Sequence, residues 1–105
     1  MQTLLPIRTL ARIDSLASVR IGSRVCISQG AYLCTGNHDF KRPSFDLRLG
    51  PILIEAESWV GAKSVLGPGS LLGEGCVVCL GSVVIGDVQP LAIVRGNPAI
   101  RVATR

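Results

Sequence analysis

Aliphatic side chains recur along the middle of this chain with a period of six residues. Read in blocks of six, the sequence gives IGSRVC, ISQGAY and LCTGNH, and after an interruption IEAESW, VGAKSV, LGPGSL, LGEGCV, VCLGSV and VIGDVQ. The first position of every block is aliphatic: Ile21, Ile27, Leu33, Ile54, Val60, Leu66, Leu72, Val78 and Val84. This period matches neither the 3.6-residue period of a helix nor the simple alternation of a strand.

Such a period predicts a chain that makes a short strand, turns through about 120° and repeats, so that three blocks close one triangular coil of about eighteen residues. We expect the first residue of each block to point into the interior and the fifth to pack near the corner. The fifth residues are small or of moderate size: Val25, Ala31, Asn37, Ser58, Ser64, Ser70, Cys76, Ser82 and Val88. Glycine in the second position, at Gly22, Gly61, Gly67 and Gly73, is expected to supply backbone freedom at the turns. An ordinary sandwich of short strands would not explain so strict a period.

The repeat is interrupted after His38, the only histidine in the chain. Residues 39–53 include the charged, proline-containing stretch "DFKRPSFDLRLGP", which predicts a loop inserted into a single domain, 1–105. On this interpretation residues 13–38 form the first coils, 54–89 the regular coils and 90–105 a C-terminal tail. Insertions into solenoids often lie on the functional face.

Composition narrows the class of function. A chain of 105 residues that is 48% hydrophobic and 17% charged is expected to be one folded domain. The net charge is +4, but the sequence has no dense run of basic residues interleaved with aromatic ones, so we expect no nucleic acid partner. A small phosphate-bearing ligand suits a charge of this size. No stretch approaches eighteen apolar residues and no secretory leader is evident, so we expect no membrane span and a cytoplasmic location.

Four cysteines raise the question of a metal or redox site. Cys76 and Cys79 form a C-x-x-C, which can bind zinc or carry redox chemistry. A zinc site needs two more ligands at suitable spacing, and only Cys26, Cys34 and one histidine remain. Free thiols in a reducing compartment, with no metal, are the favoured interpretation.

The blocks resemble the hexapeptide repeat, [LIV]-[GAED]-x-x-[STAV]-x, of left-handed parallel β-helix acyltransferases. "ISQGAYLCTGNHDF", residues 27–40, followed by "PILIEAESWVGAKSVLGPG", residues 51–69, resembles acetyltransferases of the colanic-acid-biosynthesis type and their galactoside and maltose O-acetyltransferase relatives. The resemblance covers residues 13–102. It implies an all-β, left-handed β-helix that forms a homotrimer with active sites between subunits. It also implies acetyl transfer from acetyl-coenzyme A to a hydroxyl of a sugar or related small acceptor, as in polysaccharide biosynthesis.

The resemblance assigns a role to particular residues. It implies that His38 is the general base, because an imidazole can take the proton of a hydroxyl that attacks a thioester, and no covalent nucleophile is needed. The Ala62 backbone N–H is implied as the oxyanion donor. The coenzyme contacts carried across are Trp59, Gly61, Ala62, Leu80, Ile85, Gly86 and Arg101. Asp14 and Asp39 are candidates for acceptor binding, although a loop carboxylate is more often solvated, and Trp59 could instead pack in the trimer.

The chain also departs from the family pattern. Ile85-Gly86 stands where relatives usually carry Thr-Lys, and Ile100 replaces a second lysine, so coenzyme affinity is expected to be reduced. The N-terminal part is several dozen residues shorter than in relatives. These departures keep a second hypothesis open, a non-catalytic β-helix scaffold or a degenerate, shortened acetyltransferase. A β-helix carbonic anhydrase is excluded because it needs three histidine ligands for zinc.

Overall fold

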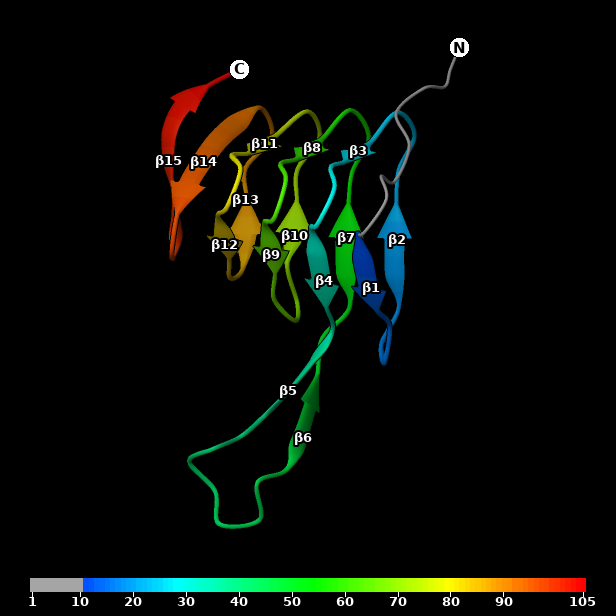
Figure 1. The fold of residues 1–105 in the computed structure, drawn as a ribbon, viewed down its shortest axis with the longest axis vertical. Coiled ribbons are helices and arrows are strands. Elements are labelled where there is room, and N and C mark those ends of the chain that lie inside the picture. The colour runs from blue at the N-terminus through cyan, green and yellow to red at the C-terminus, as the bar shows by residue number, and fades with distance from the viewer. Residues whose placement is uncertain (1–10) are drawn as a thin grey trace.

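The computed structural model describes residues 11–105, which form short β-strands wound into a three-sided coil with one long hairpin extending from it (Figure 1). Apart from the place where the hairpin is inserted, at most four residues separate consecutive strands of this coil, and the coils stack so that each side of the prism is a parallel sheet. Among residues 11–105 no helix has the length and apolarity that a membrane crossing requires.

Three sheets form the sides of the prism. The first comprises β1 (Arg12–Asp14), β4 (Tyr32–Cys34), β9 (Val65–Leu66) and β12 (Val83–Val84). The second comprises β2 (Val19–Ile21), β7 (Ile52–Ile54), β10 (Leu71–Leu72) and β13 (Asp87–Val88). The third comprises β3 (Cys26–Ile27), β8 (Trp59–Val60), β11 (Val77–Val78), β14 (Ala92–Gly96) and β15 (Ala99–Thr104), of which only β15 is antiparallel to its neighbour. A separate hairpin pairs β5 (Gly36–His38) with β6 (Leu47–Leu49).

The register confirms the eighteen-residue coil. Val60 pairs with Val78 on one side of the prism and Leu66 pairs with Val84 on the next, so the partners in each pair are eighteen residues apart. The first residues of the blocks are buried, as predicted, except Ile21, which is half-buried in the first described coil. Alternation along each short strand sends these aliphatic side chains inward and their neighbours outward.

The fifth position is also buried in eight of the nine predicted blocks, and serine hydroxyls there make hydrogen bonds at the corners. Ser58 Oγ donates to the Gly73 carbonyl over 3.1 Å, and Ser64 Oγ donates to the Cys79 carbonyl over 3.0 Å. A buried hydroxyl that lacks a partner is costly, so these bonds explain how a polar residue occupies the interior. The eight include Val88, whose place in the repeat differs from the prediction.

The inserted segment lies within a six-residue block, whereas the sequence predicted that it would begin after the block LCTGNH ends. Asn37, assigned to the fifth position of LCTGNH, is exposed, whereas Ile52 is only 1% exposed. The Gly50 N–H donates to the Thr35 carbonyl over 2.9 Å, which closes the base of the excursion. The interior block is therefore Leu33–Thr35 continued by residues 51–53, and the insertion is 36–50, not 39–53. An apolar side chain fills the interior position because burying the Asn37 amide without partners would cost more.

The last coil also differs from the prediction. Val88 pairs with Leu72 and Val94 pairs with Val78, so both take the first position of a block and lie sixteen residues beyond their partners. Gly86, at φ 94°, allows the shortened turn that produces this shift. Residues 92–104 are consequently not a simple tail, because β14 continues the third sheet and β15 folds back on it through a cis Asn97–Pro98 peptide.

Three of the four second-position glycines, Gly22, Gly61 and Gly73, serve close packing and not backbone freedom, which corrects the prediction, whereas a Cβ at Gly67 would meet only the Val84 carbonyl oxygen at 3.4 Å. A Cβ at Gly73 would lie 2.6 Å from the Pro90 nitrogen, and one at Gly61 would lie 2.7 Å from the Leu80 nitrogen. The left-handed backbone that favours glycine occurs instead at the fourth position, where Glu57 has φ 68° and Gly75 has φ 72°. Each coil therefore lies directly against the backbone of the next.

Candidate functional site

One outward corner of the prism carries an open apolar groove of about 400 Å³. Its walls come from three successive coils, because β3, β8 and β11 lie side by side in the third sheet, with Trp59 opposite Val77. The lining residues are Ser28, Trp59, Gly61, Ala62, Val77, Val78, Cys79 and Leu80. The structure thus brings together four of the residues predicted to contact the coenzyme: Trp59, Gly61, Ala62 and Leu80.

Trp59 is held in place although half of it is exposed. Its indole N–H donates to Ser28 Oγ over 2.9 Å, across the gap between β3 and β8. Gly61 lets the following coil approach, since any side chain there would meet the Leu80 backbone. No backbone hydrogen bond among residues 11–105 uses the adjacent Ala62 N–H, so it is available at the surface of the groove.

The other three predicted coenzyme residues do not line this groove. Ile85 is 74% exposed, and Gly86 forms the shortened turn of the last coil. Arg101 lies on β15, where its guanidinium donates to the Thr104 hydroxyl. The sequence did not predict four of the lining residues: Ser28, Val77, Val78 and Cys79. The stacking rule would have found Val77, because it follows Trp59 by one coil of eighteen residues.

His38 lies on the exposed hairpin and is held there by Phe45. Its Nδ1 is 3.0 Å from the Phe45 carbonyl oxygen, and the two rings stack with centroids 4.4 Å apart and planes 10° from parallel. The hairpin points away from the coils in Figure 1, and His38 does not line the groove. Within one chain, therefore, the predicted base and the predicted coenzyme groove belong to separate regions.

Asp39 stabilises the turn of the hairpin. Its N–H donates to the Asp46 carbonyl over 2.8 Å, its carboxylate accepts the Lys41 N–H over 3.2 Å, and it pairs with Arg42 at 3.5 Å. These contacts account for an aspartate at this position without an acceptor.

Asp14 lies on the outer face of β1 and accepts the Tyr32 hydroxyl over 3.0 Å. The neighbouring Cys34 thiol and the Asp14 carboxylate raise the pKa of Tyr32 to about 12. The Asp14 backbone carbonyl accepts the buried Thr35 hydroxyl over 2.8 Å, so this pair adjoins the point where the hairpin leaves the coil.

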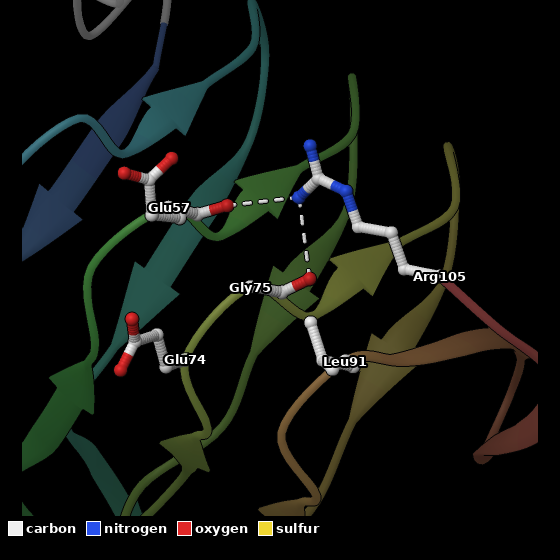
Figure 2. A pocket seen from close by; sticks show the side chains of 5 residues that line it. All are labelled: Glu57, Glu74, Gly75, Leu91 and Arg105. Carbon is white, nitrogen blue, oxygen red and sulfur yellow. Dashed lines mark hydrogen bonds between the residues drawn. The ribbon is translucent and has the colours of Figure 1, made fainter.

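A second pocket, of about 350 Å³, lies at a different corner and is organised by Arg105 (Figure 2). Arg105 Nη1 donates to the carbonyl of Glu57 over 2.9 Å and to that of Gly75 over 3.2 Å. The Glu57 side chain pairs in turn with Arg24. The Arg105 guanidinium thus donates to main-chain carbonyls in this pocket.

All four cysteines are free thiols. Burial raises the pKa of Cys76, which lies inside the prism. Within residues 11–105 no cluster of three or more histidine, cysteine or acidic side chains could hold a metal ion.

Comparison with known proteins places these observations among acetyltransferases. The chain is 35% identical over 91 residues to the Escherichia coli K12 protein named "Putative colanic acid biosynthesis acetyltransferase WcaF", an alignment covering 87% of this chain and 50% of that protein. A Vibrio cholerae hexapeptide-repeat acetyltransferase, solved with acetyl-coenzyme A, superposes with a TM-score of 0.78 at 25% identity and covers 90% of this chain and 64% of its own.

A galactoside acetyltransferase solved with coenzyme A superposes with a TM-score of 0.83 at 24% identity, over 90% of this chain and 53% of that one. These similarities confirm the predicted left-handed β-helix and the resemblance to the hexapeptide-repeat acetyltransferases. No protein-family model matches the chain. The chain spans about half the length of the Escherichia coli relative it matches.

Proposed function

Because this chain is related in sequence and in fold to the hexapeptide-repeat acetyltransferases, we propose that it transfers an acetyl group from acetyl-coenzyme A to a hydroxyl of a sugar or related small acceptor. The observation that carries the proposal is the apolar groove, which gathers Trp59, Gly61, Ala62 and Leu80 from two stacked coils. The relative from Vibrio cholerae was solved with acetyl-coenzyme A, which supports a donor of this kind.

The groove suits the thioester end of the donor. Its walls contain no charged side chain, so the acetyl group and the neutral arm beside it would replace water against apolar surface. The free Ala62 N–H is placed to donate to the carbonyl oxygen as negative charge develops there.

His38 supplies the proton transfer. The acceptor hydroxyl gives its proton to the imidazole as its oxygen forms a bond to the thioester carbonyl carbon. The tetrahedral intermediate then breaks its carbon–sulfur bond, and the imidazolium returns the proton to the departing thiolate. Atoms and charges balance without a covalent enzyme intermediate or a metal.

A second copy of the chain would bring the two regions together. In the hairpin, Gly36 pairs with Leu49 and His38 with Leu47, so these four residues share one face. Leu47 and Leu49 are each more than half exposed, and Leu80 in the groove is 74% exposed. We propose a homotrimer in which the apolar face of one hairpin covers the groove of the next chain and presents His38 to the bound thioester.

The replacement of His38 by alanine tests the proposal. We expect His38→Ala to lower the rate of coenzyme A release with sugar acceptors by about 10²- to 10⁴-fold, the usual contribution of a general base. Ser44→Ala, an exposed change in the same hairpin, is the matched control and should leave the rate unchanged. Sedimentation should give the same oligomer for all three proteins. Unchanged turnover in His38→Ala would contradict the proposed role.

One observation favours a second candidate, a β-helix scaffold without catalysis. No charged side chain lines the groove, and Arg101 and Arg105 are engaged by other partners in the described part of the chain. Calorimetric titration with coenzyme A distinguishes the two candidates. The enzyme should bind the coenzyme with measurable heat, whereas the scaffold should give none at millimolar ligand.

A further inference from the structure

Phe45 has an unusual backbone for its residue type. Its φ is 52°, in the left-handed region that residues with a Cβ adopt uncommonly and glycine adopts readily. The Phe45 N–H donates to the Arg42 carbonyl over 2.9 Å, which fixes the turn between β5 and β6. A glycine would adopt this backbone more easily, so the presence of a phenylalanine calls for an explanation in its side chain or its carbonyl.

Both parts of Phe45 contact one side chain, His38. The Phe45 carbonyl oxygen is 3.0 Å from Nδ1, and its ring lies nearly parallel to the imidazole at a centroid distance of 4.4 Å. The ring is otherwise 54% exposed, so its packing against the rest of the molecule is limited. The backbone that is unfavourable for phenylalanine is thus the one that directs two contacts at the predicted base.

The carbonyl contact determines which imidazole nitrogen can act as a base. A carbonyl oxygen only accepts hydrogen bonds, so a neutral His38 that makes this bond must carry its proton on Nδ1. Nε2 then holds the free electron pair and is the atom that can take the proton of an acceptor hydroxyl. The opposite tautomer would place two electron pairs, those of Nδ1 and the carbonyl oxygen, against each other.

The ring contact limits the orientation of the same imidazole. His38 is exposed and lies on a hairpin that stands away from the coils, so it lacks the surrounding side chains that would hold a buried histidine. A stacked aromatic neighbour restricts rotation of the imidazole about the bond that joins it to Cβ. Positioning of this kind raises the rate, because catalysis falls steeply when a reacting group is misplaced.

We propose that Phe45 is the positioning residue for His38, with its carbonyl fixing the Nδ1–H tautomer and its ring fixing the plane of the imidazole, so that Nε2 faces the acceptor. The effect of Phe45 on the reaction rate rests on the proposed acetyl transfer, but its contacts with His38 do not. Phe40, which is 78% exposed in the same loop, offers a matched aromatic control.

The tautomer can be measured directly, because the chain has a single histidine and its ¹⁵N spectrum contains one imidazole. At a pH where His38 is neutral, the full-length protein should show Nδ1 as the protonated nitrogen and Nε2 as the unprotonated one. Phe45→Gly, which frees the backbone that directs the carbonyl, should move both shifts towards the averaged values of a mobile imidazole. Phe45→Leu, which keeps the carbonyl, and Phe40→Leu should leave the protonated nitrogen unchanged. An Nε2–H tautomer, or averaged shifts in the unaltered protein, would overturn the assignment.

Activity provides the second readout. Phe45→Gly and Phe45→Leu should lower kcat by about 2- to 10-fold, the fold-change that corresponds to losing one aromatic pair, with the KM for acetyl-coenzyme A unchanged. Phe45→Tyr should retain kcat within about twofold, since it keeps the stacked ring. If Phe45→Gly loses the amide signals of the paired β5 and β6, Phe45→Leu decides the result. Unchanged kcat in Phe45→Leu would overturn the role of the ring.

These two readouts separate this inference from the proposed function. An inactive protein with the Nδ1–H tautomer would contradict the proposed function and leave the role of Phe45 in orienting His38 intact. An active protein in which His38 is averaged between tautomers would contradict only the role of Phe45.

Discussion

The coils and the hairpin of this molecule are stabilised in different ways. In the coils, each block places its aliphatic first residue in the interior, where Val60, Leu66 and Leu72 are fully buried. In the hairpin, residues 36–49, the large apolar side chains are more than half exposed, and the strands pair only with each other. The interior residues therefore stabilise the coils, whereas the large apolar side chains of the hairpin remain exposed in the single chain.

This difference between the coils and the hairpin indicates where a repeat protein can carry functional residues. Every coil provides the same environment, so a change in one block alters packing against its neighbours. The hairpin extends from the coil between Thr35 and Gly50, which are joined by a hydrogen bond. Its sequence does not have to follow the six-residue pattern. The only histidine of the chain lies in the hairpin. The groove proposed to bind acetyl-coenzyme A is instead formed by residues of the six-residue repeat.

The largest effect is expected from deletion of the insertion, which removes the hairpin and leaves only the coils. Deleting residues 36–50 joins Thr35 to Pro51 and regenerates a regular block, LCTPIL, with Ile52 in the buried fifth position. We expect acetyl transfer to fall by at least about 10²-fold, because the base is lost. The coils should still fold, since each contacts only its neighbours. Circular dichroism and an acetyl-transfer assay check this, and an unfolded deletion variant would contradict the independence of the coils.

A smaller effect is expected from two glycines that occupy the same position in neighbouring blocks. An added Cβ at Gly73 would lie 2.6 Å from the Pro90 nitrogen, whereas one at Gly67 would contact only the Val84 carbonyl oxygen, at 3.4 Å. Gly73→Ala should therefore lower the free energy of unfolding by about 1–3 kcal/mol, and Gly67→Ala should change it by less than about 0.5 kcal/mol. Urea unfolding at equal protein concentration measures both. Equal losses in the two variants would show that close packing of the coils is not the reason for glycine.

The smallest effect concerns the boundary between the coils and the hairpin. Because Cys34 and Asp14 raise the pKa of Tyr32 to about 12, the folded protein holds this phenolic proton more tightly than the unfolded chain, whose tyrosine titrates near the ordinary pKa of 10.0. The stabilisation is complete below pH about 10 and is lost as the pH rises towards about 12. Melting temperatures of Tyr32→Phe and the unaltered protein should converge over that range. A constant difference would mean that Tyr32 contributes by packing alone.

The six-residue period was sufficient to predict the fold and most of the interior. It was not sufficient to place the insertion, because Asn37 and Ile52 both satisfy the pattern and only burial distinguishes them. The groove was predicted in part, since stacking relates residues one coil apart. The contact of Phe45 with His38 was not predicted, because it depends on a positive φ in a segment without a repeat.

The most direct test of the account is whether two copies of the chain form one active site. Chains carrying His38→Ala lack the base, and chains carrying Ala62→Trp have a blocked groove, so each variant alone should be inactive. Refolded together in equal amounts, they should recover about a quarter of the unaltered rate, because about one site in four combines an intact hairpin with an intact groove from the next chain. No recovery in mixtures whose mixed oligomers are confirmed by mass would contradict the account.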